Sequence, residues 1–232
     1  MKFAIIAAGE GSRLANEGIT TPKPLIKLQG VPLIERLVRL FERHNATSIS
    51  IIINEQQPQT LAFLQNIKTK CPLNIVVKST PSSMHSLHAL SGHLQGEKFC
   101  LTTVDTLFHE KEFTEYIDAL DKCEADGVMA VTDFIDDEKP LYIATNRELD
   151  ITAFCNSPTH ETKYISGGIY GLPPKTLDIL DRCMEQGVER MRNFQRILVE
   201  NGMHFKAHPF TKIIDIDHAE DITKAEEFLA TE

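Results

Sequence analysis

The residues best suited to chemistry lie near the amino terminus, where glycines and basic side chains follow an apolar run. The run Phe3–Ala8 ends in a turn that contains Gly9 and Gly11. A strand that ends in a glycine turn leaves backbone N–H groups free to point at an anion. Arg13 and Lys23 add two fixed positive charges, which a chain of phosphates requires. This spacing predicts a site that holds the phosphates of a nucleotide.

The glycine pattern on its own permits other interpretations. Gly9 and Gly11 are not followed by the third glycine of the dinucleotide-binding fingerprint, nor by the Gly-Lys-Ser/Thr ending of a Walker loop. Neither of these two motifs is therefore favoured. Because short glycine patterns recur by chance, an ordinary tight turn is the alternative to a phosphate-binding turn.

Two acidic segments are candidates for further chemistry. Asp105 directly follows a strand-like apolar segment, where an aspartate often forms a turn or caps a helix. Asp215 and Asp217 alternate within an extended run, so a strand there would place them on one face. As an alternative role, Asp217 could cap the last helix, with Glu220 completing a capping box.

The first half of the chain alternates strand and helix patterns, which favours a mainly parallel sheet with helices on both faces. The predicted strands are Phe3–Ala7, Ser48–Ile53, Asn74–Lys78 and Phe99–Thr103. The predicted helices cover Leu33–Phe41, Gln59–Lys70, a segment from Ser82 or Ser83 to Leu94, and Glu112–Glu124. Ligands bind beyond the carboxyl ends of the strands in such sheets. The glycine turn and Asp105 both fall there.

The second half has shorter strand-like segments, which predict a small antiparallel addition that could form one wall of a pocket. These segments are Val128–Thr132, Leu141–Thr145, Ile151–Phe154 and Tyr164–Tyr170. Helices at Lys175–Gln186 and Met191–Asn201, a strand at His204–His208 and a helix at His218–Ala230 are predicted to follow. No linker divides the sequence, so residues 1–232 are predicted to form a single domain.

Composition narrows the class of protein. The chain has 232 residues, of which 42% are hydrophobic, so one large α/β domain is expected. Its net charge of −9 argues against a nucleic-acid partner. The five cysteines show no metal-site spacing, which favours reduced thiols and a cytoplasmic location. No signal peptide or membrane span is expected, because apolar runs are short and interrupted.

Three motifs together resemble the signature of the sugar-1-phosphate nucleotidyltransferases, also called nucleoside-diphosphate-sugar pyrophosphorylases. They are Ala7–Leu14, Pro22–Leu25 and Gly30–Ile34. The resemblance is to small single-domain members and extends in part to the bacterial phosphocholine cytidylyltransferases. It implies a Rossmann-like, GT-A-like nucleotidyltransferase fold and the reaction NTP + sugar 1-phosphate ⇌ NDP-sugar + pyrophosphate.

The resemblance also implies roles for individual residues. Ala8, Gly9, Gly11 and Ser12 would wrap the triphosphate, and Arg13 and Lys23 would be the catalytic cations that neutralise it. In the family, aspartates in two similar contexts bind Mg²⁺, which implies that Asp105 and Asp217 hold this metal. Hard cations of this kind prefer carboxylate oxygens and retain much of their water.

Two further segments bear on the base and the acceptor. The family reads the base near Thr80–Leu87, which makes Ser83 a candidate nucleotide-binding residue, although Ser82 and Ser83 could equally cap a helix. Gly168 resembles a glycine on the sugar-side strand that permits close approach of the acceptor. Many relatives carry a glutamate and a lysine where this chain has Phe154–Pro158. Either Lys163 takes over the phosphate contact, or the acceptor is not an ordinary hexose 1-phosphate.

Several alternatives stay open at this stage. A catalytically silent nucleotide-sugar-binding relative and a metal-dependent glycosyltransferase are the two other classes considered. A nucleotidyltransferase for a molybdopterin or isoprenoid precursor is a third alternative. Arg190, Arg192 and Arg196 would either contact an anionic group of the acceptor or form a solvated helix face. The sequence predicts an NTP and a phosphorylated small molecule as partners, and leaves the base, the acceptor and the oligomeric state open.

Overall fold

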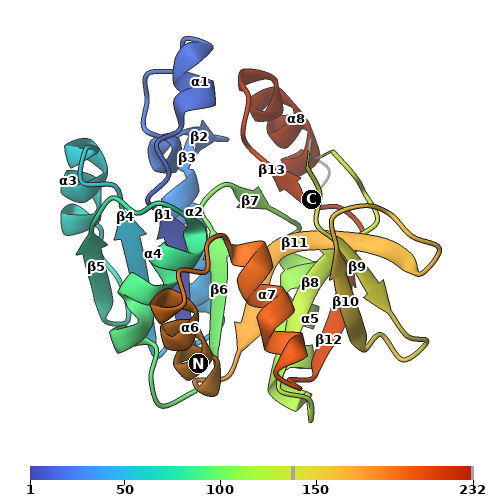
Figure 1. Cartoon of the computed structure of the whole chain (residues 1–232). Helices are drawn as coiled ribbons and strands as arrows, with labels where there is room; N and C mark the ends of the chain where they lie inside the picture. The colour runs from blue at the N-terminus through green and yellow to red at the C-terminus, as the bar shows by residue number, and fades with distance from the viewer. Residues whose placement is uncertain (137–138, 231–232) are drawn as a thin grey trace.

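A central mixed sheet organises the chain in the computed structural model, which describes residues 1–136 and 139–230 (Figure 1). The strand order along the sheet is β10-β9-β11-β6-β1-β4-β5, and β8 pairs with both β11 and β12. The strands of this sheet are β1 (Lys2–Ala7), β4 (Ser48–Ile53), β5 (Leu73–Val77), β6 (Phe99–Thr103), β8 (Gly127–Thr132), β9 (Tyr142–Thr145), β10 (Ile151–Cys155), β11 (Thr162–Leu172) and β12 (Phe205–Phe210).

Helices cover both faces of the sheet, as the alternating pattern predicts. On one face lie α2 (Leu33–Arg43) and α5 (Glu110–Lys122), and on the other lie α4 (Ser83–Leu90), α6 (Lys175–Glu185) and α7 (Met191–Glu200). The alternation of side chains along β1 divides the core, because Phe3 and Ile5 pack toward α2 whereas Ala4 and Ile6 pack toward α4. Phe3 stacks on Phe41 of α2, with ring centroids 4.3 Å apart.

The first-half strands are parallel, which confirms the predicted arrangement. β1 pairs in parallel with β4 and with β6, and β4 pairs in parallel with β5. All four strands therefore end at the same edge of the sheet.

The helices depart from the predicted bounds only at their ends. α3 covers Pro58–Asn66, and α4 stops at Leu90 before a short 3₁₀ turn.

The antiparallel strands of the second half continue the central sheet and form no separate layer. β11 pairs antiparallel with β6, with β8 and with β9. It can reach three neighbours because it is 11 residues long and its pairing with β8 shifts register between Ser166 and Tyr170. The predicted addition is thus an extension of the same sheet across β11.

A short antiparallel ribbon connects the middle of the chain with its end. β7 (Thr106–Leu107) pairs with β13 (Ile214–Asp215), and Asp215 lies opposite Thr106. The backbone N–H of Ile216 also donates to the carbonyl of Asp105, at 3.2 Å. The ribbon brings the two acidic segments together although more than a hundred residues separate them in sequence.

The last helix, α8 (Ala219–Leu229), begins one residue later than the capping alternative requires. His218 occupies the N-cap position, and its backbone N–H donates to the Asp221 carboxylate at 2.7 Å. The N–H of Asp217 donates to the same carboxylate at 3.0 Å. The capping alternative for Asp217 and Glu220 is therefore wrong, and the side chain of Asp217 points elsewhere.

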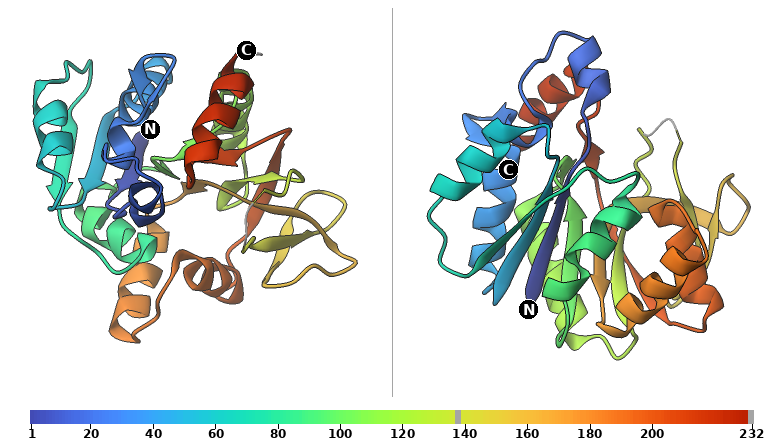
Figure 2. Two further views of the ribbon diagram at one scale, coloured as in Figure 1. Left: turned by 90° about the horizontal axis from the view of Figure 1, so that it is seen from above. Right: turned by 60° about the vertical axis from the view of Figure 1, so that its left-hand side comes forward.

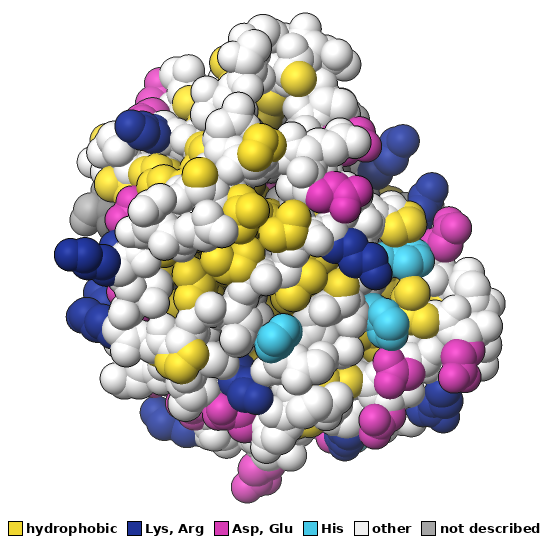
Figure 3. Space-filling model, turned by 90° about the vertical axis from the view of Figure 1, so that its left-hand side faces the viewer, with side chains coloured by type: hydrophobic (Ala, Val, Ile, Leu, Met, Phe, Trp, Pro, Cys, Tyr) yellow, Lys and Arg dark blue, Asp and Glu magenta, His cyan; other side chains and the backbone are white. Residues whose placement is uncertain are grey.

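Two small helical elements complete the end of the molecule where the parallel strands finish. α1 (Ser12–Asn16) and α8 stand side by side above this edge (Figure 2), and a 3₁₀ turn at Lys23–Leu25 follows α1 in the chain. β5 is the last strand along the sheet, and at this lateral edge apolar side chains reach the surface (Figure 3), where Val77 is 43% exposed.

All five cysteines are free. Among the described helices, none has the length and apolarity that crossing a membrane requires.

Candidate active site

Two side chains from the segment that follows β4 bind the backbone of the glycine turn after β1. The side-chain amide of Asn54 donates to the carbonyl of Ala8 at 3.0 Å, and that of Gln57 donates to the carbonyl of Gly9 at 3.2 Å. These two side chains bind carbonyls of the turn and leave its N–H groups to other partners. Within the described chain, the N–H groups of residues 9–12 donate no hydrogen bond to protein.

Gly11 is the point where this turn meets the second basic segment. Its φ of +67° lies in the left-handed region, which favours glycine. A Cβ built on Gly11 would stand 3.6 Å from the Cβ of Lys23, so the two segments are in contact. Pro22 and Pro24 flank Lys23 and fix the backbone on both sides of it.

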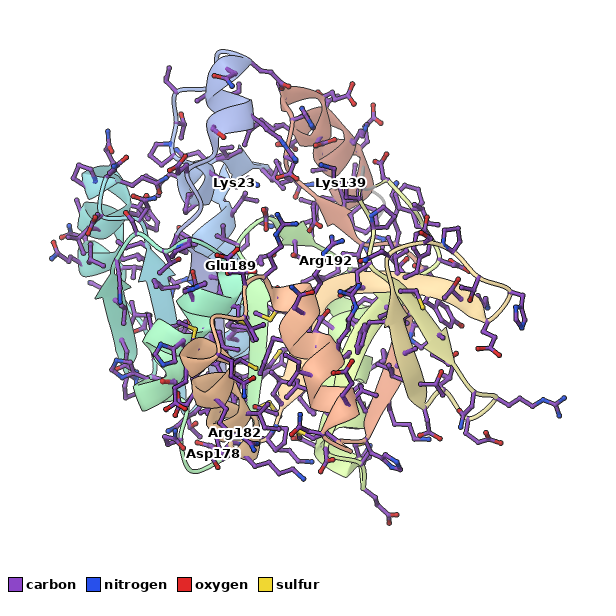
Figure 4. The ribbon with its side chains drawn as sticks, viewed as in Figure 1. Lys23, Lys139, Asp178, Arg182, Glu189 and Arg192 are labelled. Carbon is purple, nitrogen blue, oxygen red and sulfur yellow. The ribbon has the colours of Figure 1, made fainter. Side chains whose placement is uncertain are left out.

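Lys23 joins the two acidic segments. Its Nζ lies 2.5 Å from Oδ2 of Asp105 and 2.7 Å from Oδ1 of Asp217, and only 11% of its side chain is exposed. Burial alone would lower the pKa of Lys23, but the charges and hydrogen bonds of Asp105 and Asp217 outweigh it and raise the pKa. Lys23 is therefore a fixed cation, and it lies below α1 at the carboxyl edge of the sheet (Figure 4).

Arg13 extends this ion-paired row toward α8. Its Nη1 lies 2.7 Å from Oδ2 of Asp217, while Lys23 occupies the other oxygen of the same carboxylate. Arg13 is about half exposed, so its guanidinium borders open space. The sequence-predicted cations and carboxylates thus form one continuous row in the order Arg13, Asp217, Lys23, Asp105.

Asp215 lies beside this row and lines the same cavity as Arg13 and Asp217. Its Oδ1 accepts a hydrogen bond from the hydroxyl of Thr106 at 3.1 Å. The Asp215 side chain is exposed to this cavity, and protein surrounds its other sides. This desolvation, together with the negative charges of Asp105 and Asp217, raises the pKa of Asp215 to about 7.

Two pockets meet at the row. The glycine-turn pocket has a volume of about 570 Å³ and is lined by the glycine turn, Lys23, Asp105, Asn54 and the 79–86 segment. The α8 pocket has a volume of about 660 Å³ and is lined by Arg13, Asp217, Gly167, the start of α8 and the loop after β8. The ion pairs between Asp217 and both cations therefore link two separate cavities, each of which can hold one small molecule.

The structure brings most of the sequence-predicted site residues together. Lining the glycine-turn pocket are Ala8, Gly9, Gly11, Ser12, Lys23, Ser83 and Asp105. Arg13 and Asp217 line the α8 pocket. Gly168 and Lys163 line neither pocket, although Gly167, next to Gly168, lines the second one.

Gly168 lies under the acidic ribbon. Its φ is +73°, and a Cβ there would stand 3.0 Å from Oγ1 of Thr106, which is itself 2.6 Å from Oγ1 of Thr103. Because Thr106 donates to Asp215, a side chain at position 168 would push on the residues that hold the ribbon in place. Gly168 therefore positions the site, and its contact with an acceptor stays a prediction.

Replacing Gly168 by alanine is expected to lower kcat by about one to two orders of magnitude, because displaced reacting groups are costly. The left-handed backbone should also cost ~1–2 kcal/mol of stability. Gly202 is a matched control, because it has a φ of +79° with nothing within 4 Å of the added Cβ. Gly202→Ala should lose similar stability in thermal denaturation and keep its kcat. Equal kcat losses in the two variants would contradict the idea that a side chain at position 168 acts on the site through Thr106.

Lys163 and the arginines of α7 lie away from the row. The Nζ of Lys163 is 4.9 Å from the centre of the Tyr164 ring on an exposed part of β11. Arg192 donates to the carbonyl of Lys139 at 2.8 Å, near the upper end of α7 in Figure 4. Arg196 donates to the carbonyl of Phe154 at 3.0 Å. Arg192 and Arg196 thus bind neighbouring segments of the chain, and neither lines one of the two pockets.

Asn54 and Gln57 are residues that the sequence analysis missed. Both orient the glycine turn, and Asn54 also accepts a hydrogen bond from the Ser79 hydroxyl at 3.1 Å. In the sequence, Asn54 could have been recognised as a polar residue that directly follows the apolar strand Ser48–Ile53, at the same sheet edge as the glycine turn. Thr80 and Ser86, whose hydroxyl oxygens lie 2.6 Å apart, add further polar lining where the base was expected.

The donor set fits a hard divalent cation. Oxygens of Asp105 and Asp217 converge on one point, which the Lys23 ammonium now contacts. The described residues contain no group of three or more His, Cys, Asp or Glu side chains that could enclose a metal ion. Two carboxylates with water completing the shell are typical of Mg²⁺, whereas zinc sites take three or four protein ligands that include His or Cys.

Comparisons with known proteins agree with this geometry. The chain is 24% identical over 211 residues to a probable mannose-1-phosphate guanylyltransferase of rice, covering 88% of this chain and 58% of that one. It is 25% identical over 207 residues to a glucose-1-phosphate cytidylyltransferase of Salmonella typhimurium, covering 78% of each. It spans about half the length of several other curated relatives. The structure of an inositol-1-phosphate CTP transferase from T. maritima has the same fold, with a TM-score of 0.82 at 18% identity over 99% of this chain and 94% of that one.

The match to a family model covers most of the chain. Residues 3–166, which include the glycine turn, Lys23 and Asp105, match the MobA-like NTP transferase domain. The predicted nucleotidyltransferase resemblance and Rossmann-like fold are confirmed. The chain therefore belongs to the family of MobA-like NTP transferase domains.

Proposed function

We propose that this chain transfers a nucleotidyl group from an NTP to a phosphorylated small molecule, such as a sugar 1-phosphate, and releases pyrophosphate. The NTP occupies the glycine-turn pocket, with its phosphates against the N–H groups of the turn, which donate no hydrogen bond to the described protein. The acceptor occupies the α8 pocket, with its phosphate toward Arg13. The observation that carries this proposal is the row of Arg13, Asp217, Lys23 and Asp105 where the two pockets meet.

The reaction needs positioning and charge neutralisation more than proton transfer. An oxygen of the acceptor phosphate attacks the α-phosphorus of the NTP, and the bond between that phosphorus and the bridging β-oxygen breaks. The electron pair leaves with pyrophosphate. Because a phosphate monoester is already an anion, no general base is obligatory. Lys23 acts near the α-phosphate, and Arg13, which lines the α8 pocket, acts on the acceptor phosphate rather than on the triphosphate as the resemblance implies.

Asp105 and Asp217 would hold Mg²⁺. The metal, when bound, supplies positive charge to the α-phosphate and to the leaving pyrophosphate. The protein's own part is to bring two anionic molecules together against a fixed row of cations. Positioning of this kind can remove ~7–11 kcal/mol of the barrier, and each preorganised donor aimed at developing charge adds ~2.7–4 kcal/mol.

Two alternatives fit the site less well. A glycosyltransferase of the metal-dependent class relies on an Asp-x-Asp motif after a central strand, and Asp105 is followed by Thr106 and Leu107. A silent regulatory relative would not need Lys23 and both carboxylates in contact. The alternative of a non-sugar acceptor, such as phosphocholine, stays within the proposed reaction. It is favoured by the missing charged residues in Phe154–Pro158.

The test is pyrophosphate release from each of CTP, UTP, GTP, ATP and dTTP, with Mg²⁺ and a panel of sugar 1-phosphates and other phosphorylated acceptors. We expect release with at least one pair, and its loss when the metal is removed with EDTA. The cognate NTP should also stabilise the protein against thermal unfolding, by about 2.7 kcal/mol at 100 times its Kd. No release with any pair, together with no stabilisation by any NTP, contradicts the proposed function.

A further inference from the structure

A carboxylate at the end of α1 binds the start of α8, beside the Arg13 cation. Glu17 directly follows α1, and both oxygens of its carboxylate are engaged. Its Oε1 lies 2.6 Å from Nδ1 of His218, and its Oε2 accepts the backbone N–H of Ala219 at 2.6 Å. Because an ionised carboxylate can only accept hydrogen bonds, Nδ1 of His218 is the donor in the first contact. The two helices are thereby joined across the end of the molecule (Figure 2).

The two contacts keep Glu17 ionised. The hydrogen bond from the N–H of Ala219, followed by the one from His218, holds the pKa of Glu17 below its usual value. The first turn of a helix also favours a negative charge, because its N–H groups have no partner within the helix. A carboxylate at this place therefore binds the start of α8 more firmly than a neutral side chain would.

A second carboxylate binds the residues just before. Asp221 accepts the backbone N–H groups of Asp217 and His218, at 3.0 Å and 2.7 Å. Asp221 and Glu17 together bind the N–H groups of residues 217, 218 and 219, one carboxylate from inside α8 and the other from α1. Asp217 is the first of these three residues, so the direction of its side chain depends on how firmly this short segment is held.

Helix α1 is in turn attached to the glycine turn. Gly11 is its N-cap, and the carbonyl of Gly11 accepts the N–H of Ala15 at 3.0 Å. The N–H of Glu17 donates to the carbonyls of Arg13 and Leu14, both at 3.1 Å, which fixes the backbone from which the Glu17 side chain extends. Leu14 is the one buried side chain among the five described residues of α1. Polar contacts with α8 therefore contribute much of what holds α1 in place.

The glycine turn, α1 and the start of α8 form one connected path between the two halves of the site. Phosphates bound to the N–H groups of residues 9–12 would fix the position of α1. Arg13 and Glu17 both extend from α1 to α8, but they act differently. Arg13 contacts a carboxylate oxygen of Asp217, which a metal ion would also use. Glu17 binds the neighbouring residues and leaves the Asp217 carboxylate to other partners.

We propose that Glu17 is a positioning residue that couples nucleotide binding at the glycine turn to metal binding at Asp217. This inference rests on the proposed function and goes beyond it, because Glu17 acts through the start of α8. With nucleotide bound, Glu17 holds residues 217–219 in the orientation in which Asp217 meets the metal. Nucleotide and metal then strengthen each other's binding, and by linkage the strengthening is equal in both directions.

The experiment measures Mn²⁺ binding by electron paramagnetic resonance, with and without a non-hydrolysable analogue of the NTP that stabilises the protein most. The ratio of the two Kd values is the coupling factor. Glu17→Ala should lower this factor about fivefold, because the start of α8 loses its partner on α1. Asp217→Asn gives the lower limit. No acceptor is present, so a direct contact between Glu17 and an acceptor in the α8 pocket cannot produce the result.

Glu226→Ala is the matched control. Glu226 also lies on α8 and accepts a backbone N–H from a distant segment, that of Gln29 at 2.7 Å, but it lines neither pocket. Its loss should leave the coupling factor within twofold of the parent. Glu17→Gln is the conservative variant, because its amide oxygen can still accept the N–H of Ala219. Its coupling factor should lie between those of the parent and Glu17→Ala.

Three results would overturn the inference. They are a coupling factor in Glu17→Ala within twofold of the parent, an equal loss in Glu226→Ala, and a parent in which nucleotide does not change Mn²⁺ affinity. Glu17 is 38% exposed, so its replacement leaves the core intact. If Glu17→Ala nevertheless fails to fold, Glu17→Gln decides, and a parent-like factor in that variant overturns the inference. The proposed function fails separately, through the absence of pyrophosphate release and of stabilisation by any NTP.

Discussion

Replacing Lys23 by methionine is expected to lower kcat by a factor of about 10²–10³, which is typical of the loss of one preorganised donor. The ammonium lies between Asp105 and Asp217, and 11% of its side chain is exposed. Methionine is an unbranched side chain one atom shorter than lysine, and it lacks the ammonium group. The α-phosphate then loses its fixed cation, and the two carboxylates lose the group that holds them together.

The same substitution separates two roles of Lys23. In the nucleotide-free protein the ammonium contacts the same carboxylate oxygens that a metal would use. Lys23→Met should therefore bind Mn²⁺, used as a spectroscopic substitute for Mg²⁺, more tightly than the parent in the absence of nucleotide. Catalysis falls while metal affinity rises, which is a combination that simple unfolding cannot produce.

Lys27→Met is the control for this prediction. Lys27 is exposed, lies four residues further along the chain and lines neither of the two pockets. It should keep the kcat and the Mn²⁺ affinity of the parent. A Lys23→Met protein with kcat within threefold of the parent would contradict the catalytic role of Lys23.

Replacing Asp105 by asparagine is expected to abolish Mg²⁺-dependent turnover. The change is isosteric, so the backbone contact between the Asp105 carbonyl and the N–H of Ile216 should persist. Half of the carboxylate pair is lost, and Lys23 keeps only Asp217 as an anionic partner. The cation site then has one carboxylate in place of two, and we expect this weaker hold on Mg²⁺ to stop turnover.

Turnover as a function of Mg²⁺ concentration measures this effect. The Asp105→Asn protein should show no saturable dependence at concentrations that saturate the parent. Asp118→Asn is a suitable control, because Asp118 is 66% exposed on α5 and pairs only at 3.7 Å with Lys122. Unchanged Mg²⁺ dependence in Asp105→Asn would dismiss Asp105 as a metal ligand.

Much of the fold could be predicted from the sequence because local patterns determine it. The strands at Phe3–Ala7 and Ser48–Ile53 are apolar runs bounded by turns, and they pair in parallel as expected. The second half was harder, because short strands with polar turns carry no information on their partners. β11 pairs with β6, β8 and β9, and the register shift in its pairing with β8 between Ser166 and Tyr170 depends on contacts that the sequence does not display.

The candidate site was predictable where a residue lies at the end of a parallel strand. The glycine turn follows β1 and Asp105 follows β6, so both reach the same edge. Asp217 required the family resemblance, because the ribbon of β7 and β13 that brings it to Lys23 joins segments far apart in sequence. Its alternative role as a helix cap failed, because its carboxylate is occupied by Arg13 and Lys23.

Other site features depend on long-range geometry and could not be read locally. Asn54 and Gln57 act on the glycine turn through side-chain amides that cross from one strand end to the next. Arg192 and Arg196 of α7 donate to the backbone carbonyls of Lys139 and Phe154, so both guanidinium groups are engaged with the chain itself. The α8 pocket combines α8 with the loop after β8, which only the folded chain places together.

The most direct test of the account is Mn²⁺ binding, measured by electron paramagnetic resonance with and without a non-hydrolysable NTP analogue. If metal and nucleotide bind together, then the glycine turn, the two cations and the two carboxylates act as one site. The parent should bind Mn²⁺ more tightly when the analogue is present, and Asp105→Asn and Asp217→Asn should each lose this nucleotide-dependent binding. Parent-like binding of Mn²⁺ and analogue by both variants would show that Asp105 and Asp217 do not hold the metal that binds with the nucleotide.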